Sequence, residues 1–261
     1  MKKRLVIKVG SSILSNGDTL ELKQIEALCQ FIAKLKAKFD IILVSSGAVA
    51  SGYTKLHLDK SIIENKQALA SIGQPLLMET YRQILSKYNI IPAQLLLIGS
   101  TFDSRKRTAY AKRTIEILLQ NQILPIINEN DSIAQGELEL SFGDNDRLSA
   151  SVAHYFNSAM LVILSDVYGY YDKNPLEYSN ANLIKNVSNI SEDLLKLEQK
   201  SGSNFSTGGI VTKLMAADFL LKNDREMFLC SGFDLKPTLE FLLNDIHSFG
   251  TLFSKTNGVN I

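Results

Sequence analysis

The sequence predicts an α/β fold, a three-layer α/β/α sandwich with a mostly parallel central sheet, and three observations support this prediction. Short, nearly continuous apolar runs of strand length alternate along the chain with longer segments of helical periodicity. Near-continuous apolar strands are typical of a parallel sheet buried on both faces. At 261 residues with 45% hydrophobic residues, the chain can also bury a sizeable core.

Apolar runs of about four to six residues are expected to form the strands of this sheet. They are residues 5–9, 41–44, 93–98, 124–127, 160–164 and 227–230, with 251–253 as a final edge strand. Between them, apolar residues recur at helical spacing in 21–39, 62–88, 107–120, 148–156, 210–222 and 235–243. The second of these helices should break near Gly73-Gln74-Pro75, because proline lacks the backbone N–H of the helical ladder.

No repeat, low-complexity tract or linker divides the chain, so we expect one domain over residues 1–261. The net charge of +1 gives no electrostatic case for a nucleic-acid or membrane-surface partner. The apolar runs are too short to span a bilayer. Cys29 and Cys230 form no CxxC pair and are expected to be buried thiols of a cytoplasmic protein. The three histidines show no zinc-binding spacing.

Four of the expected strands end in small or polar residues. The endings are 8–12, 45–47, 128–131 and 165–166. In open parallel sheets, ligands bind in the crevice beyond the carboxyl ends of the strands. Turn chemistry explains one such ending more easily than four, so we expect a binding crevice here. Acidic and amide side chains in 128–131 and again in 143–146 favour a small cationic or zwitterionic ligand.

Lys8 lies inside an apolar strand, where a charge is costly unless it is paired or reaches a solvated crevice. The alternative is an edge strand from which the lysine extends to water. Gly10 favours the crevice, because it lets a ligand approach the backbone closely. Lys213 follows Gly208-Gly209 at the start of a predicted helix, where backbone N–H groups attract anions. The two lysines together suggest a phosphate site, although the Walker A pattern is absent.

Five motifs are spread along nearly the whole chain: VIKVGSS (6–12), SSGAVASG (45–52), INEND (127–131), FGDNDRLSA (142–150) and TGGIVTK (207–213). With these motifs, the chain resembles the amino acid kinase family, and within it the glutamate 5-kinase branch. Single motifs are shared across the superfamily, whereas the pairing of NEND (128–131) with GDND (143–146) is more specific to the glutamate-phosphorylating branch.

The resemblance implies ATP-dependent phosphorylation of the side-chain carboxylate of L-glutamate, the first step of proline biosynthesis. Lys8 and Lys213 would stabilise the transferring phosphoryl group, and Asp146 would hold the lysines. The glutamate-binding residues would be Ser46, Asp131 and Asn145, supported by Gly47 and Asn130. The ATP-binding residues would be Lys8, Gly10, Ser165, Asp166, Thr207, Gly208, Gly209, Ile210, Val211, Thr212 and Lys213. Residues from about 1 to 150 would carry the glutamate site and 151–261 the ATP site.

The same resemblance implies Mg²⁺, held mainly by phosphate oxygens and water, with no protein ligand that we can name. It also implies a cytoplasmic homo-oligomer (a dimer or tetramer) and a form that lacks the C-terminal PUA-like domain of many members. Ser206 and Ile210 depart from the commoner Gly and Met of the family pattern.

Two alternatives share the predicted fold. A sister kinase for acetylglutamate, aspartate or uridylate would keep the lysines, but Asp131 facing a free ammonium argues against an acetylated amine. A non-catalytic glutamate or proline sensor would have no need of Lys8, Asp146 and Lys213, and all three are present. We therefore expect a kinase.

Overall fold

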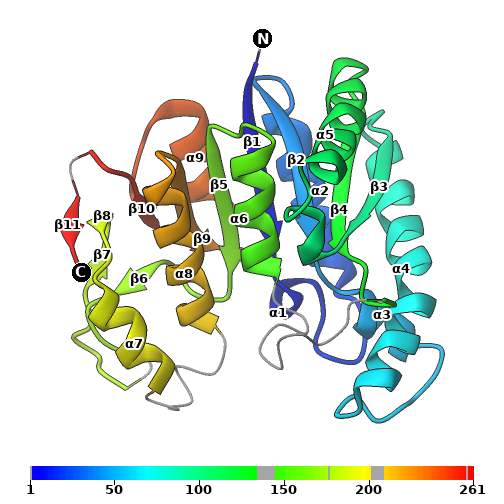
Figure 1. Cartoon of the computed structure of the whole chain (residues 1–261), viewed down its shortest axis with the longest axis horizontal. Coiled ribbons are helices and arrows are strands. Elements are labelled where there is room, and N and C mark those ends of the chain that lie inside the picture. The colour runs from blue at the N-terminus through cyan, green and yellow to red at the C-terminus, as the bar shows by residue number, and fades with distance from the viewer. Residues whose placement is uncertain (1, 134–144, 176, 201–208, 257) are drawn as a thin grey trace.

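The computed structural model of the chain describes residues 2–133, 145–175, 177–200, 209–256 and 258–261. Within them, the central sheet has nine strands in the order β11-β8-β10-β9-β5-β1-β2-β4-β3 (Figure 1). The strands are β1 (Lys3–Val9), β2 (Phe39–Ser45), β3 (Pro92–Leu97), β4 (Leu124–Glu129), β5 (Met160–Ser165), β8 (Asn186–Asn189), β9 (Glu226–Ser231), β10 (Thr251–Phe253) and β11 (Val259–Asn260). Strands β6 (Tyr170–Tyr171) and β7 (Leu183–Ile184) form a separate antiparallel pair.

The sheet is parallel except where β10 runs antiparallel to β9. The prediction of a mostly parallel sheet is therefore confirmed. The prediction of 251–253 as an edge strand is wrong in one respect, because β10 lies between β8 and β9. A run of three apolar residues does not reveal in the sequence whether a strand has neighbours on one side or on both.

Strand β1 lies inside the sheet, with β2 on one side and β5 on the other. Lys8 is opposite Val44 of β2 and Ile163 of β5, so the edge-strand explanation of this lysine is wrong. The chain passes from β1 to β2 on one side and returns later to β5 on the other. The carboxyl end of β1 is thus the topological switch point, where open parallel sheets bind ligands.

Helices cover both faces of the sheet, as the three-layer prediction requires. Figure 1 shows α6 and α8 in front of the strands. The helices are α1 (Ser11–Leu14), α2 (Leu22–Leu35), α3 (Ala48–Tyr53), α4 (Ile63–Ser86), α5 (Arg105–Gln120), α6 (Asn145–Tyr155), α7 (Glu192–Lys200), α8 (Gly209–Lys222) and α9 (Lys236–Asn244), with a 3₁₀ turn at Gly99–Thr101.

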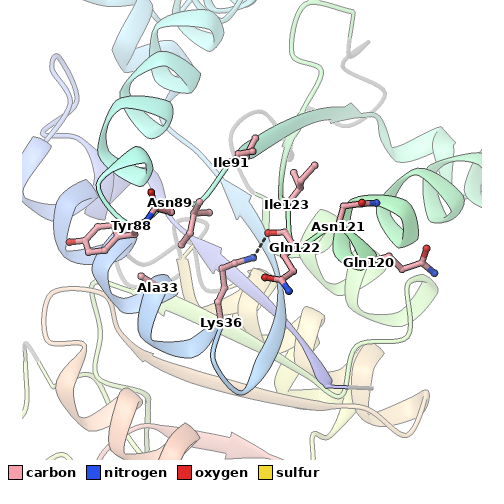
Figure 2. A pocket seen from close by; sticks show the side chains of 10 residues that line it. Ala33, Lys36, Tyr88, Asn89, Ile91, Gln120, Asn121, Gln122 and Ile123 are labelled. Carbon is pink, nitrogen blue, oxygen red and sulfur yellow. Dashed lines mark hydrogen bonds between the residues drawn. The ribbon is translucent and has the colours of Figure 1, made fainter.

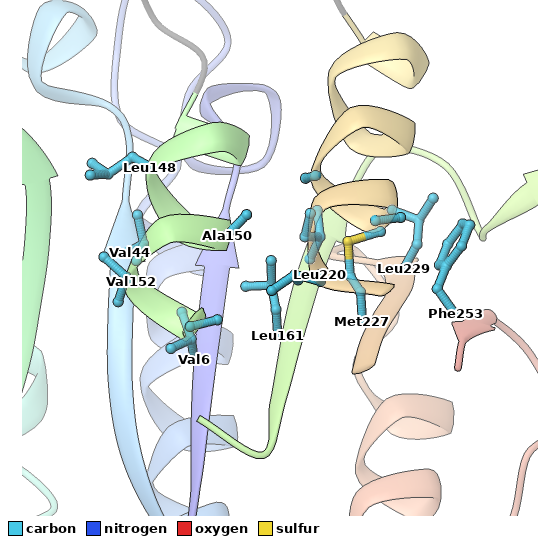
Figure 3. Close-up of a cluster of buried hydrophobic side chains, with 14 of the residues drawn as sticks. Val6, Val44, Leu148, Ala150, Val152, Leu161, Leu220, Met227, Leu229 and Phe253 are labelled. Atoms are coloured by element: carbon cyan, nitrogen blue, oxygen red, sulfur yellow. The ribbon is translucent and has the colours of Figure 1, made fainter. Parts of the chain in front are cut away.

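Two hydrophobic clusters hold the layers together. One joins the sheet to α5, α6 and α8, and Figure 3 shows its members Val6, Val44 and Leu161 facing side chains of the helices. The other joins the opposite face to α2 and α4 and includes the fully buried Tyr81. Because β1, β2 and β5 are apolar on both faces, the packed layers fix where these three strands end.

Helix α4 is continuous from Ile63 to Ser86 and contains Pro75, so the predicted break is wrong. Gly73 serves helix packing instead. A Cβ on Gly73 would lie 1.8 Å from the carbonyl oxygen of Ala48, and one on Gly52 would lie 1.9 Å from that of Leu69. The two glycines allow α3 and α4 to cross in backbone contact. This contact fixes α4 beside the polar ends of the strands, and packing of this kind overrides the local preference at Pro75.

Candidate active site

A buried ion cluster lies at the carboxyl end of β1. Lys8 Nζ is 2.5 Å from Asp146 Oδ1, and Lys213 Nζ is 3.1 Å from Asp146 Oδ2. Asp146 is fully buried, and the two lysines expose only 5% and 8% of their surface. These side chains come from β1, from the first turn of α6 and from α8, so the fold assembles the cluster from three distant segments. Its net charge is positive, because one carboxylate faces two ammonium groups.

The pKa of Asp146 reflects two opposing effects. Burial would raise the pKa of this carboxyl, but the charges of Lys8 and Lys213 and their hydrogen bonds outweigh burial and lower it. The position in the first turn of α6 also favours the anion, because the amino end of a helix is electropositive. Asp146 is therefore ionised at neutral pH and holds both lysines in place.

The start of α8 lies against the same ion cluster. Lys213 Nζ donates to the carbonyl oxygen of Gly209 at 2.7 Å, and Thr212 Oγ1 donates to Asp146 Oδ2 at 3.0 Å. At the end of β1, a Cβ on Gly10 would lie 3.7 Å from Lys8 Nζ. Glycine keeps that space open beside the ammonium group. Lys8, Thr212 and Lys213 thus contact Asp146, while Gly10 lies beside Lys8 and Gly209 accepts from Lys213.

The predicted glutamate-binding residues begin next to this cluster. Asn145 precedes Asp146 in the chain, and its Nδ2 donates to Ser46 Oγ at 3.2 Å and to the carbonyl oxygen of Ser45 at 2.8 Å. Gly47 immediately precedes α3 and has a φ of +103°, a backbone conformation that favours glycine. The turn after β2 therefore directs Ser46 toward Asn145.

Asp131 follows β4, and burial raises the pKa of its carboxyl to about 6. No described residue forms an ion pair or hydrogen bond with this carboxylate. Asn130 anchors the same loop, because its backbone N–H donates to the carbonyl oxygen of Leu97 at 2.8 Å. A largely buried acid without a protein cation is suited to a cationic group on a ligand.

The remaining predicted ATP-binding residues have different surroundings. Ser165 ends β5, and its Oγ donates to Asp166 Oδ1 at 2.9 Å, while Asp166 is exposed. Ile210 and Val211 place their side chains in the hydrophobic core, so only their backbone is available to a nucleotide. Thr207 and Gly208 lie outside the described residues, as does Gly143-Asp144 of the second acidic cluster.

Comparison with known proteins agrees with this architecture. The amino acid kinase family matches residues 3–231. The chain belongs to the amino acid kinase family. Glutamate 5-kinase of Wolinella succinogenes is 55% identical over 254 residues, covering 96% of this chain and 97% of the relative. Glutamate 5-kinase of Helicobacter hepaticus is 54% identical over 260 residues, covering 100% and 98%.

Among solved structures, the carbamate kinase from Giardia lamblia bound to AMP-PNP has a TM-score of 0.66 at 14% identity. The superposition covers 97% of this chain and 98% of that chain. At this identity the likeness shows the fold alone. It confirms that the three-layer sandwich of this chain is the amino acid kinase fold.

Two residues that join this hydrogen-bonded group, Asn128 and Gln74, were not among the site residues predicted from the sequence. Asn128 accepts from Asn145 Nδ2 at 2.9 Å, and its own Nδ2 donates to Gln74 Oε1 at 2.9 Å. Asn128 could have been selected, because it is the first polar residue at the end of a buried strand. Gln74 carried no such signal, since one glutamine in a helix resembles any other.

A pocket of about 470 Å³ lies at the opposite edge of the sheet, beside the amino ends of β2, β3 and β4 (Figure 2). Lys36 Nζ donates to the carbonyl oxygen of Gln122 at 2.9 Å across it. None of the described residues that line it carries a carboxylate. The buried ion cluster of Lys8, Asp146 and Lys213 lies at the other edge of the sheet, at the carboxyl ends of the strands.

Three further findings concern the described part of the chain. It contains no helix long and apolar enough to cross a membrane. It contains no group of three His, Cys, Asp or Glu residues arranged to hold a metal ion. Cys29 and Cys230 are free thiols in the core, and burial raises the pKa of each to about 12, as expected for unreactive structural cysteines.

Proposed function

We propose that this chain is a glutamate 5-kinase, which transfers the γ-phosphoryl group of ATP to the side-chain carboxylate of L-glutamate. This reaction is the first step of proline biosynthesis. The two relatives at 54–55% identity, matched over nearly their full length, support the assignment. In the structure, the observation that carries it is the buried cluster of Lys8, Asp146 and Lys213 at the switch point of the sheet.

The chemistry of the substrates fits these residues. A glutamate carboxylate is already ionised at neutral pH, so the nucleophile needs no general base. The barrier lies in bringing an anionic nucleophile up to an anionic phosphate and in the charge that spreads over the transferring group. Lys8 and Lys213 are preorganised cations where that charge would develop. Asp146 keeps their ammonium groups in position without cancelling their combined charge.

The two substrates would occupy different halves of the crevice. We place glutamate over residues 1–150, with Ser46, Asp131 and Asn145 as its contacts and with Gly47 and Asn130 supporting. We place ATP over residues 151–261, beside Ser165, Asp166 and the segment 207–213. Lys8 and Gly10, at the end of β1, would contribute to the ATP side from the first half of the chain.

Mg²⁺ would accompany ATP and neutralise phosphate charge. The described residues do not form a protein cage for it, and the carboxylate of Asp146 is engaged by two lysines. Phosphate oxygens and water are then its expected ligands. Glutamate and ATP are the proposed partners. A homo-oligomer, a dimer or tetramer in the cytoplasm, remains our expectation from the family.

The function is tested by trapping the acyl phosphate with hydroxylamine. Purified protein, ATP and Mg²⁺ are incubated with glutamate, N-acetylglutamate, aspartate or UMP, and hydroxamate and ADP are measured. Glutamate should give hydroxamate and the others little turnover. Faster turnover of N-acetylglutamate, aspartate or UMP would assign a sister kinase, and glutamate binding without any turnover would assign a sensor.

A further inference from the structure

Four side-chain amides form a continuous hydrogen-bonded chain from Asn145, which is next to the ion cluster, to the edge strand of the sheet. Asn145 donates to Asn128 Oδ1, Asn128 Nδ2 donates to Gln74 Oε1, and Gln74 Nε2 donates to Gln94 Oε1, each at 2.9 Å. The residues lie on α6, β4, α4 and β3. We call Asn145, Asn128, Gln74 and Gln94 the amide relay. Its first three members are buried, whereas Gln94 is exposed on the edge strand.

A backbone group sets the direction of the whole relay. The atom of Asn145 that faces the carbonyl oxygen of Ser45 at 2.8 Å must be the nitrogen, because a carbonyl oxygen only accepts. Nδ2 of Asn145 then requires an acceptor from Asn128, which turns the Asn128 nitrogen toward Gln74. The backbone N–H of Glu129 also donates to Asn128 Oδ1, at 2.9 Å, and favours the same orientation. The orientation of each amide group therefore determines the orientation of the next one along the relay.

The relay uses both hydrogens of the Asn145 amide. One goes to Ser45, with Ser46 nearby, and the other goes to Asn128. Oδ1 of Asn145 receives no hydrogen bond from the described residues. The only group this side chain can offer a substrate is therefore an acceptor, which suits an ammonium group and not a carboxylate.

Buried polar chains of this kind stabilise a fold poorly, since apolar side chains of similar volume pack at lower cost. The position of the Gln74 backbone is nevertheless fixed by the packing of α4 against α3. Its neighbour Gly73 is in backbone contact with Ala48 of α3, the helix that follows Gly47. The crossing of α3 and α4 thus holds Gln74 at a fixed depth beside β4.

We propose that Gln74 is a positioning residue for substrate recognition, which acts through Asn128 to keep Asn145 Oδ1 presented to the ammonium group of glutamate. This inference rests on the proposed function. Without an acceptor at position 74, the buried Nδ2 of Asn128 loses its partner in the relay, and the Asn128 side chain shifts to find another one. That shift weakens the hydrogen bond from Asn145 Nδ2 to Asn128 Oδ1, so Asn145 Oδ1 is presented less accurately to the ammonium group.

The test compares Gln74→Leu, which removes the acceptor, with Gln74→Glu, which keeps one for Asn128 Nδ2. Gln74→Leu should raise the KM for glutamate by about three- to tenfold, as expected for one net hydrogen bond. The KM for ATP and kcat should change less than about twofold. Gln74→Glu should restore the glutamate KM to within about twofold of the unaltered protein. The Ki of glutarate, which has no ammonium group, should be the same in all three proteins.

Two controls separate positioning from folding. Gln83→Leu makes the same change on an exposed part of α4, where the side chain donates to Glu79 of its own helix, and should alter neither KM. Gln94→Leu removes the exposed end of the relay without threatening the core and should give a smaller rise in glutamate KM, about twofold. Thermal midpoints are recorded for every variant.

The outcomes are distinct. Absence of glutamate turnover by the unaltered protein would refute the proposed function itself. Glutamate turnover with an unchanged KM in Gln74→Leu would refute the relay alone. Equal losses toward glutamate, ATP and glutarate, accompanied by a lower thermal midpoint, would show that Gln74 only supports the fold and would also overturn the proposal.

Discussion

At the end of β1, Lys8 and Lys213 share the buried Asp146, whereas at the end of β4 Asp131 is a largely buried acid with no described cation beside it. The neighbouring charges lower the pKa of Asp146, while burial raises that of Asp131 to about 6. In the first site every charged side chain has an oppositely charged partner, and one positive charge remains in excess. In the second site the carboxylate of Asp131 has no described partner, so a cationic group on a ligand could supply one. The first site therefore suits an anionic group such as a phosphate, and the second suits a cationic group such as an ammonium.

Asp146→Asn should have the largest effect on stability and tests whether the two lysines of the first site depend on the Asp146 carboxylate. The change keeps the shape but leaves two buried ammonium groups side by side, so the free energy of unfolding at pH 7 should fall by about 3–5 kcal/mol. Because its pKa is lowered, Asp146 contributes its full stabilisation above pH 4, and the difference should shrink as pH falls through the lowered pKa. Urea denaturation at pH 7 and at about pH 2.5, below the ordinary pKa of an aspartate, measures both values. An unchanged midpoint at pH 7 would mean that the lysines do not depend on Asp146.

Lys8→Ala and Lys213→Ala should each lower kcat by about 10²–10³-fold, because each removes a cation from the place where phosphoryl charge develops. The thermal midpoint should change little, since Asp146 keeps one lysine partner. Lys222→Ala is the matched control, because Lys222 is also on α8 but forms an exposed pair with Asp218 at 2.8 Å. Near-normal turnover in either crevice variant would remove that lysine from the mechanism.

Asp131→Asn tests the second site and keeps its shape while removing its charge. Hydrogen bonds to charged groups contribute about 1.5–3 kcal/mol, so the KM for glutamate should rise about ten- to a hundredfold. The KM for ATP should stay within about twofold. Initial rates with each substrate varied in turn give both constants. A raised ATP KM with an unchanged glutamate KM would show that the two halves of the crevice are assigned the wrong way round.

The raised pKa of Asp131 predicts a pH dependence in a defined window. The protonated acid cannot pair with an ammonium group, so glutamate affinity should be constant above pH 7 and fall as pH drops through about 6. The loss should reach about tenfold at pH 5, where the glutamate carboxylate itself is still ionised. Calorimetric titration from pH 8 to pH 5 measures it, with Asp131→Asn as a weak but pH-independent reference. Affinity that is constant throughout would exclude Asp131 as the ammonium partner.

The sequence by itself predicted the parallel sheet, because near-continuous apolar strands admit few other environments. It also predicted where the polar residues gather, because the carboxyl ends of parallel strands meet at one edge of the sheet and four of these strands end in small or polar residues. Lys8 and Lys213 could be selected by local chemistry, a charge within an apolar strand and a lysine behind paired glycines. These features depend on residues that are close together in the chain.

Only the tertiary structure decided the partners. Asp146 meets Lys8 and Lys213 across 138 and 67 residues of the chain, and nothing local to Asp146 indicates either lysine. Helix α4 continues through Pro75, and Gly73 packs against the backbone of α3, although helix propensity alone predicts a break at this point. Gln74 acquires its place in the relay for the same reason. Local patterns determine which residues are buried and where strands end, but long-range packing decides which buried polar groups meet.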